Sequence, residues 1–271
     1  MNSYDDIMKN IEACDDKIIE VLNERLAYTE EITKYKAEHH MPILRHEEEV
    51  RQLKNLAGKY SNHPYKEEFE EIFRSISVSS RKIQAEVLFP KNIVLIGFMG
   101  AGKSSLASYL SENFYMRTVE TDREIVQREG ISIPEIFELY GEEYFREKET
   151  EVIRELGTGS RKVISVGGGA VMRDENVEYM KESGIIVLLT ATPKAILDRV
   201  KGGTERPLLN GNMNEDYIAA LMEKRRVRYE EVADLMIDTT DKTIPEVCEA
   251  VIMHLPVVVK QTTQTDLYGQ M

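Results

Sequence analysis

The sequence predicts an all-helical N-terminal domain followed by an α/β domain with a parallel sheet. The chain has 271 residues, which suits two domains better than one. Up to Val87 the apolar residues recur in alternating steps of four and three, which is the spacing of amphipathic helices. Beyond Pro90 short apolar runs alternate with helical segments, as in buried parallel strands joined by helical crossovers.

The first helix is predicted from a stripe of apolar residues that begins near Tyr4. A helix of this length would extend about 50 Å at ~1.5 Å per residue, which is more than a domain of this size covers with its own chain. We therefore expect a homodimer that forms through the N-terminal helices. The stripe consists of Ile7, Ile11, Cys14, Ile18, Val21, Tyr28, Ile32 and Tyr35.

Two more helices are expected in the N-terminal domain. Pro42 ends the first helix or begins the second, which extends to about Tyr60 and is broken by Asn62-His63-Pro64. The third helix has one apolar face, which runs from Phe69 to Val87. The helical pattern thus predicts a three-helix domain over residues 1–88.

Arg25 takes the place of a core residue in the apolar stripe, between Val21 and Tyr28. Ser80 has a similar place in the third helix, and Gln84 follows one turn later. An inward cation beside an inward hydroxyl and amide favours a polar pocket within the helical bundle. The alternative is that Arg25 extends to the surface along its apolar stem.

Four strands are predicted in the second half, and the α/β domain is expected over residues 90–256. Each apolar run leads into a glycine or a turn, which suits strands buried on both faces. Residues 257–271 are polar and are expected to form a disordered tail. The predicted strands are Asn92 to Ile96, Val163 to Val166, Ile185 to Leu189 and Leu235 to Ile237.

Composition and charge exclude several classes of protein. Hydrophobic residues make up 42% of the chain and charged residues 31%, which is the composition of a folded globular protein. The net charge of -13 argues against nucleic acid as a partner, because binding to its phosphates depends on clustered cations. A small anionic ligand stays compatible with this charge, since a few inward cations can dominate a pocket.

The cysteines and the N-terminus favour the cytoplasm. Cys14 and Cys248 lie far apart, and the segment MNSYDDIMKN lacks the basic and apolar runs of a secretory signal. No apolar run reaches the ~20 residues that a membrane helix requires. The sequence therefore predicts a cytoplasmic protein that does not enter a membrane.

The strongest motif is GFMGAGKS, Gly97 to Ser104, which follows the first predicted strand and leads into a helix. This is the context in which the GxxxxGK[ST] pattern forms a phosphate-binding loop. Backbone N–H groups and the helix start would bind phosphate oxygens, Lys103 would reach the β and γ phosphates, and Ser104 would ligate Mg²⁺. The motif therefore predicts ATP as a substrate.

The segments VETD, GEEYFREKE, ISVGGG, TERPLL and RRVRYEEVAD follow this loop in order. Together with GFMGAGKS they resemble shikimate kinase, from about Lys91 to His254. The resemblance implies a P-loop kinase fold and transfer of the γ-phosphate of ATP to the 3-hydroxyl of shikimate. The alternative within this fold is a kinase of another small metabolite, such as gluconate.

The resemblance also implies roles for individual residues. Asp122 would accept from the shikimate hydroxyls and help to activate the attacking one, and Arg206 in a lid would close on the transferring phosphate. Glu120 stands where the family usually has an aspartate. The implied nucleotide-binding residues are Gly100, Ala101, Gly102, Lys103, Ser104, Ser105, Arg199, Arg206 and Lys242, with Mg²⁺ on Ser104. The implied shikimate-binding residues are Asp122, Arg146, Gly168 and Arg225.

The first domain resembles the all-helical chorismate mutases, from about Tyr4 to Val87. The order and spacing of Arg25, Lys36, Glu49, Ser80 and Gln84 carry this resemblance, which implies that these residues bind chorismate and promote its rearrangement to prephenate.

Departures from the family pattern at three positions leave the role of the first domain open. The family's arginines in the first and second helices fall on Met8 and Glu48, and its usual aspartate falls on Arg45. A carboxylate that faces a dianionic ligand is repulsive. The domain is therefore either an active mutase, with compensation by Lys9, Arg45 or Arg51, or a binding and regulatory module, or only a dimerisation arm.

Overall fold

The computed structural model describes residues 3–39, 41–43, 46–159, 161–200 and 214–255, without the side chains of residues 46–50 and 52–53. The chain divides into two compact units, Met1–Leu88 and Phe89–Met271. The expected tail at 257–271 lies outside the described residues. None of the described helices combines the length and apolar character that crossing a bilayer would need.

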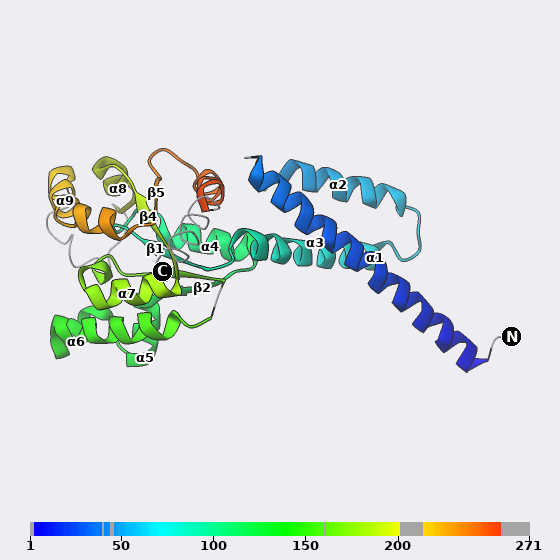
Figure 1. The fold of residues 1–271 in the computed structure, drawn as a ribbon, viewed down its shortest axis with the longest axis horizontal. Helices are drawn as coiled ribbons and strands as arrows, with labels where there is room; N and C mark the ends of the chain where they lie inside the picture. Colours follow the sequence, from blue (N-terminus) through cyan, green and yellow to red (C-terminus); the bar gives the residue numbers. More distant parts are fainter. Residues whose placement is uncertain (1–2, 40, 44–45, 160, 201–213, 256–271) are drawn as a thin grey trace, which may run out of the picture. The chain divides into compact units, whose positions relative to one another are not determined.

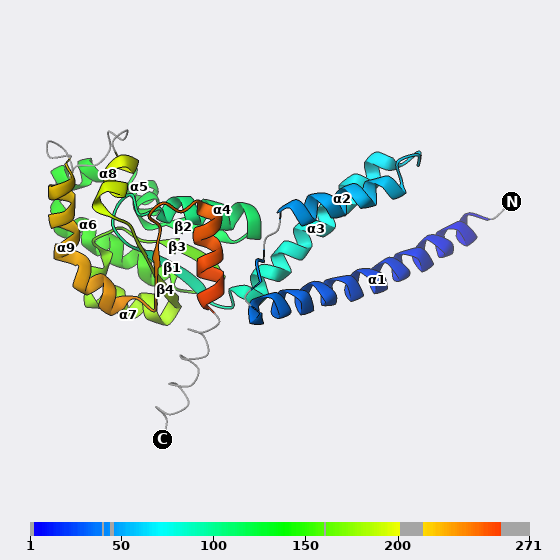
Figure 2. The same cartoon turned by 90° about the horizontal axis from the view of Figure 1, so that it is seen from above.

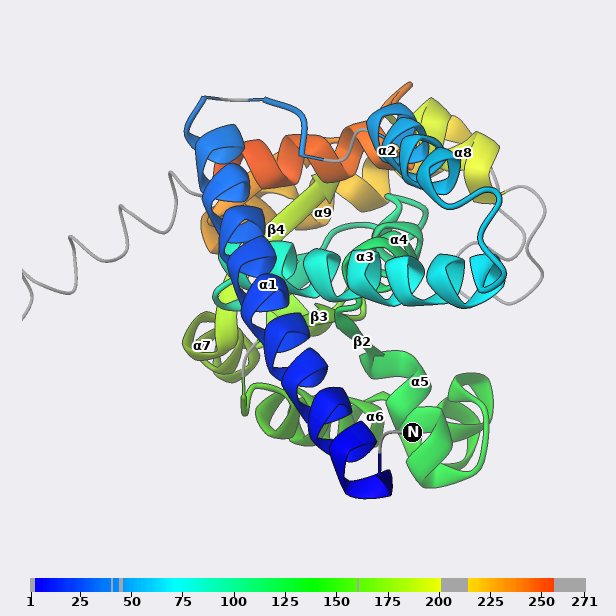
Figure 3. The ribbon, with the colours of Figure 1, turned by 90° about the vertical axis from the view of Figure 1, so that its right-hand side faces the viewer.

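The first unit consists of α1 (Tyr4–Glu38), α2 (His46–Lys59) and α3 (Lys66–Leu88). Helix α1 begins with a capping box, in which the Ser3 hydroxyl accepts from the Asp6 N–H and the Asp6 carboxylate accepts from the Ser3 N–H. It crosses α3, against which it packs (Figure 3). The prediction of an all-helical N-terminal domain is therefore confirmed.

All eight residues of the predicted apolar stripe on α1 are exposed. Ile7, Ile11, Ile18, Val21 and Tyr28 are all large apolar residues with exposed side chains. Figure 1 shows α1 extending away from α2 and α3 towards its N-terminus. Helix packing within the first unit therefore covers only part of the apolar surface that the sequence places on this helix.

The second unit is built on a parallel sheet in the order β2-β3-β1-β4-β5. The four predicted strands are present. The additional strand, β2, lies at the edge of the sheet and has Val119 as its one large apolar residue, so the pattern of apolar runs does not predict it. The strands are β1 (Asn92–Ile96), β2 (Arg117–Glu120), β3 (Lys162–Ser165), β4 (Gly184–Thr190) and β5 (Leu235–Asp238).

Helices cover both faces of this sheet, and Figure 2 shows the strands between α4 and α7. All residues of β1 are buried, which accounts for its continuous apolar run. The helices are α4 (Lys103–Phe114), α5 (Thr121–Glu129), α6 (Ile133–Leu156), α7 (Asp174–Ser183), α8 (Pro193–Val200) and α9 (Glu215–Val232), with a short 3₁₀ turn η1 (Ala170–Met172). A last helical segment spans residues 244–255.

The strand order determines where a ligand can bind. Strand β1 lies between β3 and β4; the connection that follows it leads to β2 on one side, and the connection after β3 crosses to β4 on the other side. In open parallel sheets ligands bind outside the carboxyl ends of the strands, at such a switch point. Here this position is occupied by the loop after β1 and the glycines after β3.

Candidate active site

A cleft of about 890 Å³ opens at the carboxyl ends of the strands. It gathers the predicted kinase residues that the structure describes, although they come from distant parts of the chain. Arg206 lies outside the described residues. The predicted residues that line the cleft are Gly100, Ala101, Gly102, Lys103, Ser104, Ser105, Asp122, Arg146, Gly168, Arg199, Arg225 and Lys242.

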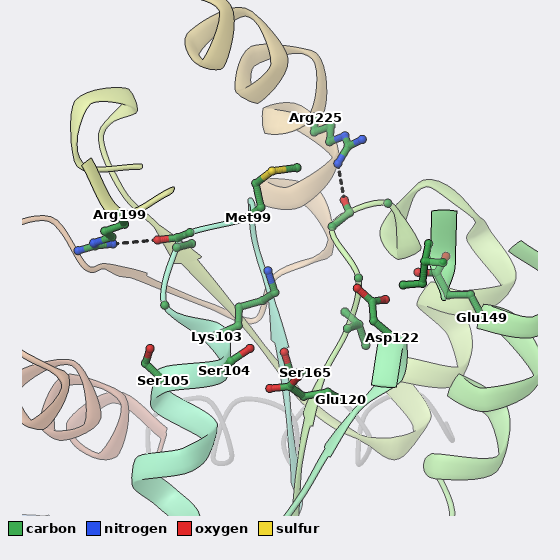
Figure 4. A pocket seen from close by; sticks show the side chains of 18 of the residues that line it. Met99, Lys103, Ser104, Ser105, Glu120, Asp122, Glu149, Ser165, Arg199 and Arg225 are labelled. Carbon is green, nitrogen blue, oxygen red and sulfur yellow. Dashed lines mark hydrogen bonds between the residues drawn. The ribbon is translucent and has the colours of Figure 1, made fainter. Parts of the chain in front are cut away.

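The loop between β1 and α4 forms one end of the cleft. Lys103 is the first residue of α4, and its ammonium donates to the carbonyls of Gly97 at 2.8 Å and Phe98 at 3.3 Å. Figure 4 shows this side chain pointing into the pocket. A cation beside a helix N-terminus, where backbone N–H groups lack helical partners, is a suitable receptor for phosphate oxygens.

Ser104, Glu120 and Ser165 lie close together below Lys103 (Figure 4). Their oxygens, with those of nearby Asp122, are hard ligands of the type that Mg²⁺ prefers. Glu120 is paired with Arg123 at 3.0 Å. Within the described ranges no group of three His, Cys, Asp or Glu residues could hold a metal by itself. The donor set therefore fits a Mg²⁺ ion that shares its ligands with nucleotide phosphates and water.

Asp122 lies in the first turn of α5, between the phosphate loop and the glycines after β3. Burial raises the pKa of this carboxyl, and the nearby charges of Lys103 and Arg146 oppose the rise. The preceding residue, Thr121, is buried, and its hydroxyl accepts from the Gly167 N–H at 3.1 Å. This contact ties α5 to the glycine segment.

Arg146 lies in the second part of α6, beyond the non-helical backbone at Gly141. Its guanidinium donates to Glu142 Oε1 at 2.9 Å and to Glu149 Oε2 at 2.7 Å. The Glu149 carboxyl is wholly buried, and its other oxygen, Oε1, has no hydrogen-bond partner among the described residues. Burial raises the pKa of Glu149 to about 7, although Arg146 opposes this shift.

Two glycines after β3 let charged side chains approach the backbone closely. A Cβ at Gly167 would lie 2.6 Å from Glu149 Oε1 and 2.9 Å from Asp122 Oδ1. A Cβ at Gly169 would lie 2.7 Å from the terminal nitrogens of Arg146. The absence of side chains therefore lets two carboxyls and a guanidinium lie directly against the backbone of this segment.

Arg225 reaches the same glycine segment from α9, and its Nη1 donates to the Gly168 carbonyl at 3.1 Å. Figure 4 shows Arg225 and Arg199 on different sides of the pocket. Arg146 and Arg225 thus bring two guanidinium groups to the side of the cleft formed by residues 167–169. Paired guanidinium groups are a natural receptor for a carboxylate.

Arg199 and Lys242 lie near the opposite side of the phosphate loop. Arg199 Nη1 donates to the Gly100 carbonyl at 3.2 Å and to the Thr239 hydroxyl at 2.9 Å. Lys242 Nζ donates to the Asp238 carbonyl at 2.7 Å.

Thr239 itself is buried, and its hydroxyl lies within hydrogen-bond distance of the carbonyls of Ala101 and Thr190. It therefore links the phosphate loop to the ends of β4 and β5.

Sequence reasoning missed Glu149, Ser165 and Thr239. Glu149 could have been found, because it follows Arg146 by three residues on one helix face. Ser165 directly precedes the glycine segment at the end of β3, but one hydroxyl carries little signal by itself. The contact between Thr239 and Arg199 spans 40 residues and has no periodic pattern.

In the first unit, Arg25 Nη1 donates to the Ser80 hydroxyl at 2.6 Å, which brings together two of the residues that carry the mutase resemblance. The Ser80 hydroxyl lies 2.9 Å from the Ile76 carbonyl. Gln84 has a buried side-chain oxygen without a partner among the described residues. Lys36 is half-buried, and the side chain of Glu49 lies outside the described part of the chain. The Arg25 side chain is exposed, and its guanidinium nevertheless forms a hydrogen bond to Ser80 on α3.

Comparison with known families agrees with both resemblances. The model of the shikimate kinase family matches residues 99–256, and the model of chorismate mutase type II matches residues 7–85. The chain is 48% identical over 157 residues to a shikimate kinase of Geobacter sulfurreducens, covering 58% of this chain and 86% of that protein. It is 43% identical over 162 residues to one of Thermodesulfovibrio yellowstonii, covering 60% of this chain and 93% of the relative.

Solved structures give the same result. A shikimate kinase from Acinetobacter baumannii in complex with shikimate superposes with a TM-score of 0.57 and 35% identity, covering 63% of this chain and 94% of that chain. A shikimate kinase from Bacteroides thetaiotaomicron gives a TM-score of 0.55 and 28% identity, covering 63% of this chain and 98% of that chain. The chain therefore belongs to the shikimate kinase family and carries, ahead of the kinase domain, a chorismate mutase type II domain.

Proposed function

We propose that the second unit transfers the γ-phosphate of ATP to the 3-hydroxyl of shikimate. The observation that carries this proposal is the distribution of charge in the cleft. Lys103 and the phosphate loop form a receptor for the nucleotide, and Arg146 and Arg225 form a receptor for a carboxylate at the glycine segment. Asp122 lines the same cleft and carries a carboxyl suited to an acceptor hydroxyl.

The residues of the cleft would promote the reaction mainly by positioning and by neutralising charge. Asp122 would accept a hydrogen bond from the 3-hydroxyl, orient it towards the γ-phosphate, and take up its proton as the bond to phosphorus forms. Lys103 would bind the oxygens on which negative charge is spread, and Arg206 is assigned the same task by the resemblance. Mg²⁺ held through Ser104, with Glu120 nearby, would neutralise further phosphate charge.

The alternative substrate is another small metabolite, such as gluconate. The match of residues 99–256 to the shikimate kinase family favours shikimate. The test is steady-state kinetics of the purified chain with shikimate and with gluconate, and of the variant Arg146→Ala. We expect the variant to raise the KM for shikimate at least tenfold, because it loses a charged hydrogen bond to the carboxylate. An unchanged KM would contradict the assignment.

For the first unit we propose that Arg25, Lys36, Glu49, Ser80 and Gln84 form a site for chorismate. The contact between Arg25 and Ser80 and the buried acceptor of Gln84 support a polar site between α1 and α3. Loss of chorismate in the presence of the full chain, followed by absorbance, distinguishes catalysis from binding. If the disappearance of chorismate is catalysed by this site, the variant Arg25→Ala should abolish it. Binding of chorismate without turnover would instead indicate a regulatory module.

We also propose that the chain forms a homodimer through α1 and works in the cytoplasm. The exposed apolar residues of α1 support the dimer. Cys14 and Cys248 form no disulfide, which suits a reducing compartment.

A further inference from the structure

Tyr229 lies one helical turn after Arg225 on α9, so the two side chains share a face of the helix. The Tyr229 side chain is 5% exposed, and its ring is part of the main hydrophobic cluster of the second unit. Its hydroxyl donates to the Gly168 carbonyl at 2.6 Å. A buried aromatic ring therefore presents one polar atom to the glycine segment of the active site.

The same Gly168 carbonyl also accepts from Arg225 Nη1 at 3.1 Å. A phenol has one proton, which Tyr229 uses for Gly168, and its oxygen can still accept. Burial raises the pKa of the Tyr229 hydroxyl, and the nearby positive charge of Arg225 opposes this rise. Tyr229 and Arg225 thus form a set of two hydrogen bonds that share one acceptor, the Gly168 carbonyl.

This set of hydrogen bonds restricts two groups that could otherwise rotate: the Arg225 guanidinium and the peptide group after Gly168. An arginine side chain has many rotamers, and an acceptor that a second donor holds in place restricts the orientation of the remaining N–H groups of its guanidinium. The Gly168 carbonyl also fixes the peptide plane, so the direction of the Gly169 N–H follows from it. The neighbouring glycines supply no side chain that could do this.

We propose that Tyr229 is a positioning residue for the acceptor, holding Arg225 and the peptide after Gly168 in the orientation that binds the substrate carboxylate. This inference rests on the role proposed above for Arg225. Tyr229 touches neither reacting group and acts only through its two partners. A tyrosine that served the core alone would be replaceable by phenylalanine at no cost to substrate affinity.

The test is Tyr229→Phe in the full chain, which removes the hydroxyl and keeps the ring. The dissociation constant of shikimate, measured by calorimetry, should rise about threefold to tenfold, as expected for loss of one hydrogen bond. The KM for ATP and the melting temperature should change little. The matched control is Tyr179→Phe, which removes the hydrogen bond of an exposed tyrosine hydroxyl to Glu175, outside the cleft.

The same substitution made in a chain that already lacks Arg225 separates a positioning role of Tyr229 from a general structural effect. In Arg225→Ala, the further change Tyr229→Phe should alter the dissociation constant less than twofold, because the group through which Tyr229 acts is already absent. An equal loss in both backgrounds, or equal losses of ATP and shikimate affinity in Tyr229→Phe, would overturn the inference. If the unaltered chain did not bind shikimate, the proposed function would fail. If it bound and Tyr229→Phe bound equally well, only this inference would fail.

Discussion

Arg146 Nη1 donates to Glu149 Oε2 at 2.7 Å, and the carboxyl that accepts this bond has no exposed surface. Desolvation raises the pKa of Glu149 to about 7, Arg146 lowers it, and Asp122 adds to the rise. A group that changes its charge near neutral pH therefore lies against the arginine that we assign to the substrate carboxylate.

The first prediction is that shikimate affinity falls as pH rises through about 7. The pKa of Glu149 lies above its ordinary value of 4.5, so the carboxyl is mostly neutral at pH 6 and ionised at pH 8. The charges that face it are those of Arg146, Asp122 and Arg173. Ionised Glu149 neutralises Arg146 and repels a second carboxylate, so the KM for shikimate should rise severalfold between pH 6 and pH 8.

The control for this pH dependence is Glu149→Gln, which keeps a hydrogen-bond acceptor for Arg146 and cannot ionise. Its KM for shikimate should stay nearly constant over the same range. An unaltered pH profile in this variant would show that another group titrates. Asp122, whose pKa is also raised, should affect kcat rather than KM, because we assign it to the reacting hydroxyl.

The second prediction separates the structural and functional roles of Arg146. Arg146→Ala leaves the buried Glu149 carboxyl without its cation, and breaking such a pair costs about 3 kcal/mol when the charge remains. The carboxyl escapes this cost by protonation, so the melting temperature should fall more at pH 8 than at pH 6. The double variant Arg146→Ala with Glu149→Gln should recover the melting temperature at pH 8 and still bind shikimate weakly. Calorimetry measures both properties.

The parts of this chain that could be predicted from the sequence are those with a local pattern. The length of α1 followed from one stripe of apolar spacing, and the phosphate loop followed from eight consecutive residues in a strand-to-helix context. Strand β2 was missed because the edge of a sheet needs no apolar run. The prediction that Arg146 and Arg225 belong to one site came from the family resemblance and not from the spacing of the residues.

The long-range polar contacts of the second unit had no signal in the sequence. Thr239 is one polar residue among several after β5, and its link to Arg199 depends on the order of the strands. Tyr229 likewise has the spacing of a core residue, and only the structure brings its hydroxyl to Gly168. Glu149 follows Arg146 by three residues, a spacing that favours an ion pair on a helix, but nothing in the sequence indicated that the Glu149 carboxyl would be buried.

The third prediction concerns the nucleotide end of the cleft. Thr239→Val keeps the shape of the side chain and removes the hydroxyl that joins Arg199 to Ala101 and Thr190. The KM for ATP should rise about threefold to tenfold, because Arg199 loses an acceptor and the phosphate loop loses a tie. Shikimate binding should be unchanged. Thr158→Val is the matched control, since it removes an exposed hydroxyl that bonds to the Glu155 carbonyl. Equal effects in both variants would refute a specific role of Thr239.

The fourth prediction is that the unaltered chain is a dimer, with twice the mass of 31.1 kDa, and that Val21→Glu converts it to a monomer. Val21 is 62% exposed on α1, and a carboxylate buried at an apolar interface would cost several kcal/mol. Met236→Glu is the control, because Met236 is 57% exposed but lies on β5 of the second unit. Light scattering after size exclusion measures the mass.

Kinase turnover per chain should stay within twofold in Val21→Glu, because the described residues that line the cleft all belong to the second unit. Chorismate consumption should fall with dimer content if a site between α1 and α3 needs the partner's α1 for closure. A monomeric unaltered chain would refute the dimer. It would also leave the exposed stripe of α1 without the partner that its length and apolar spacing predict.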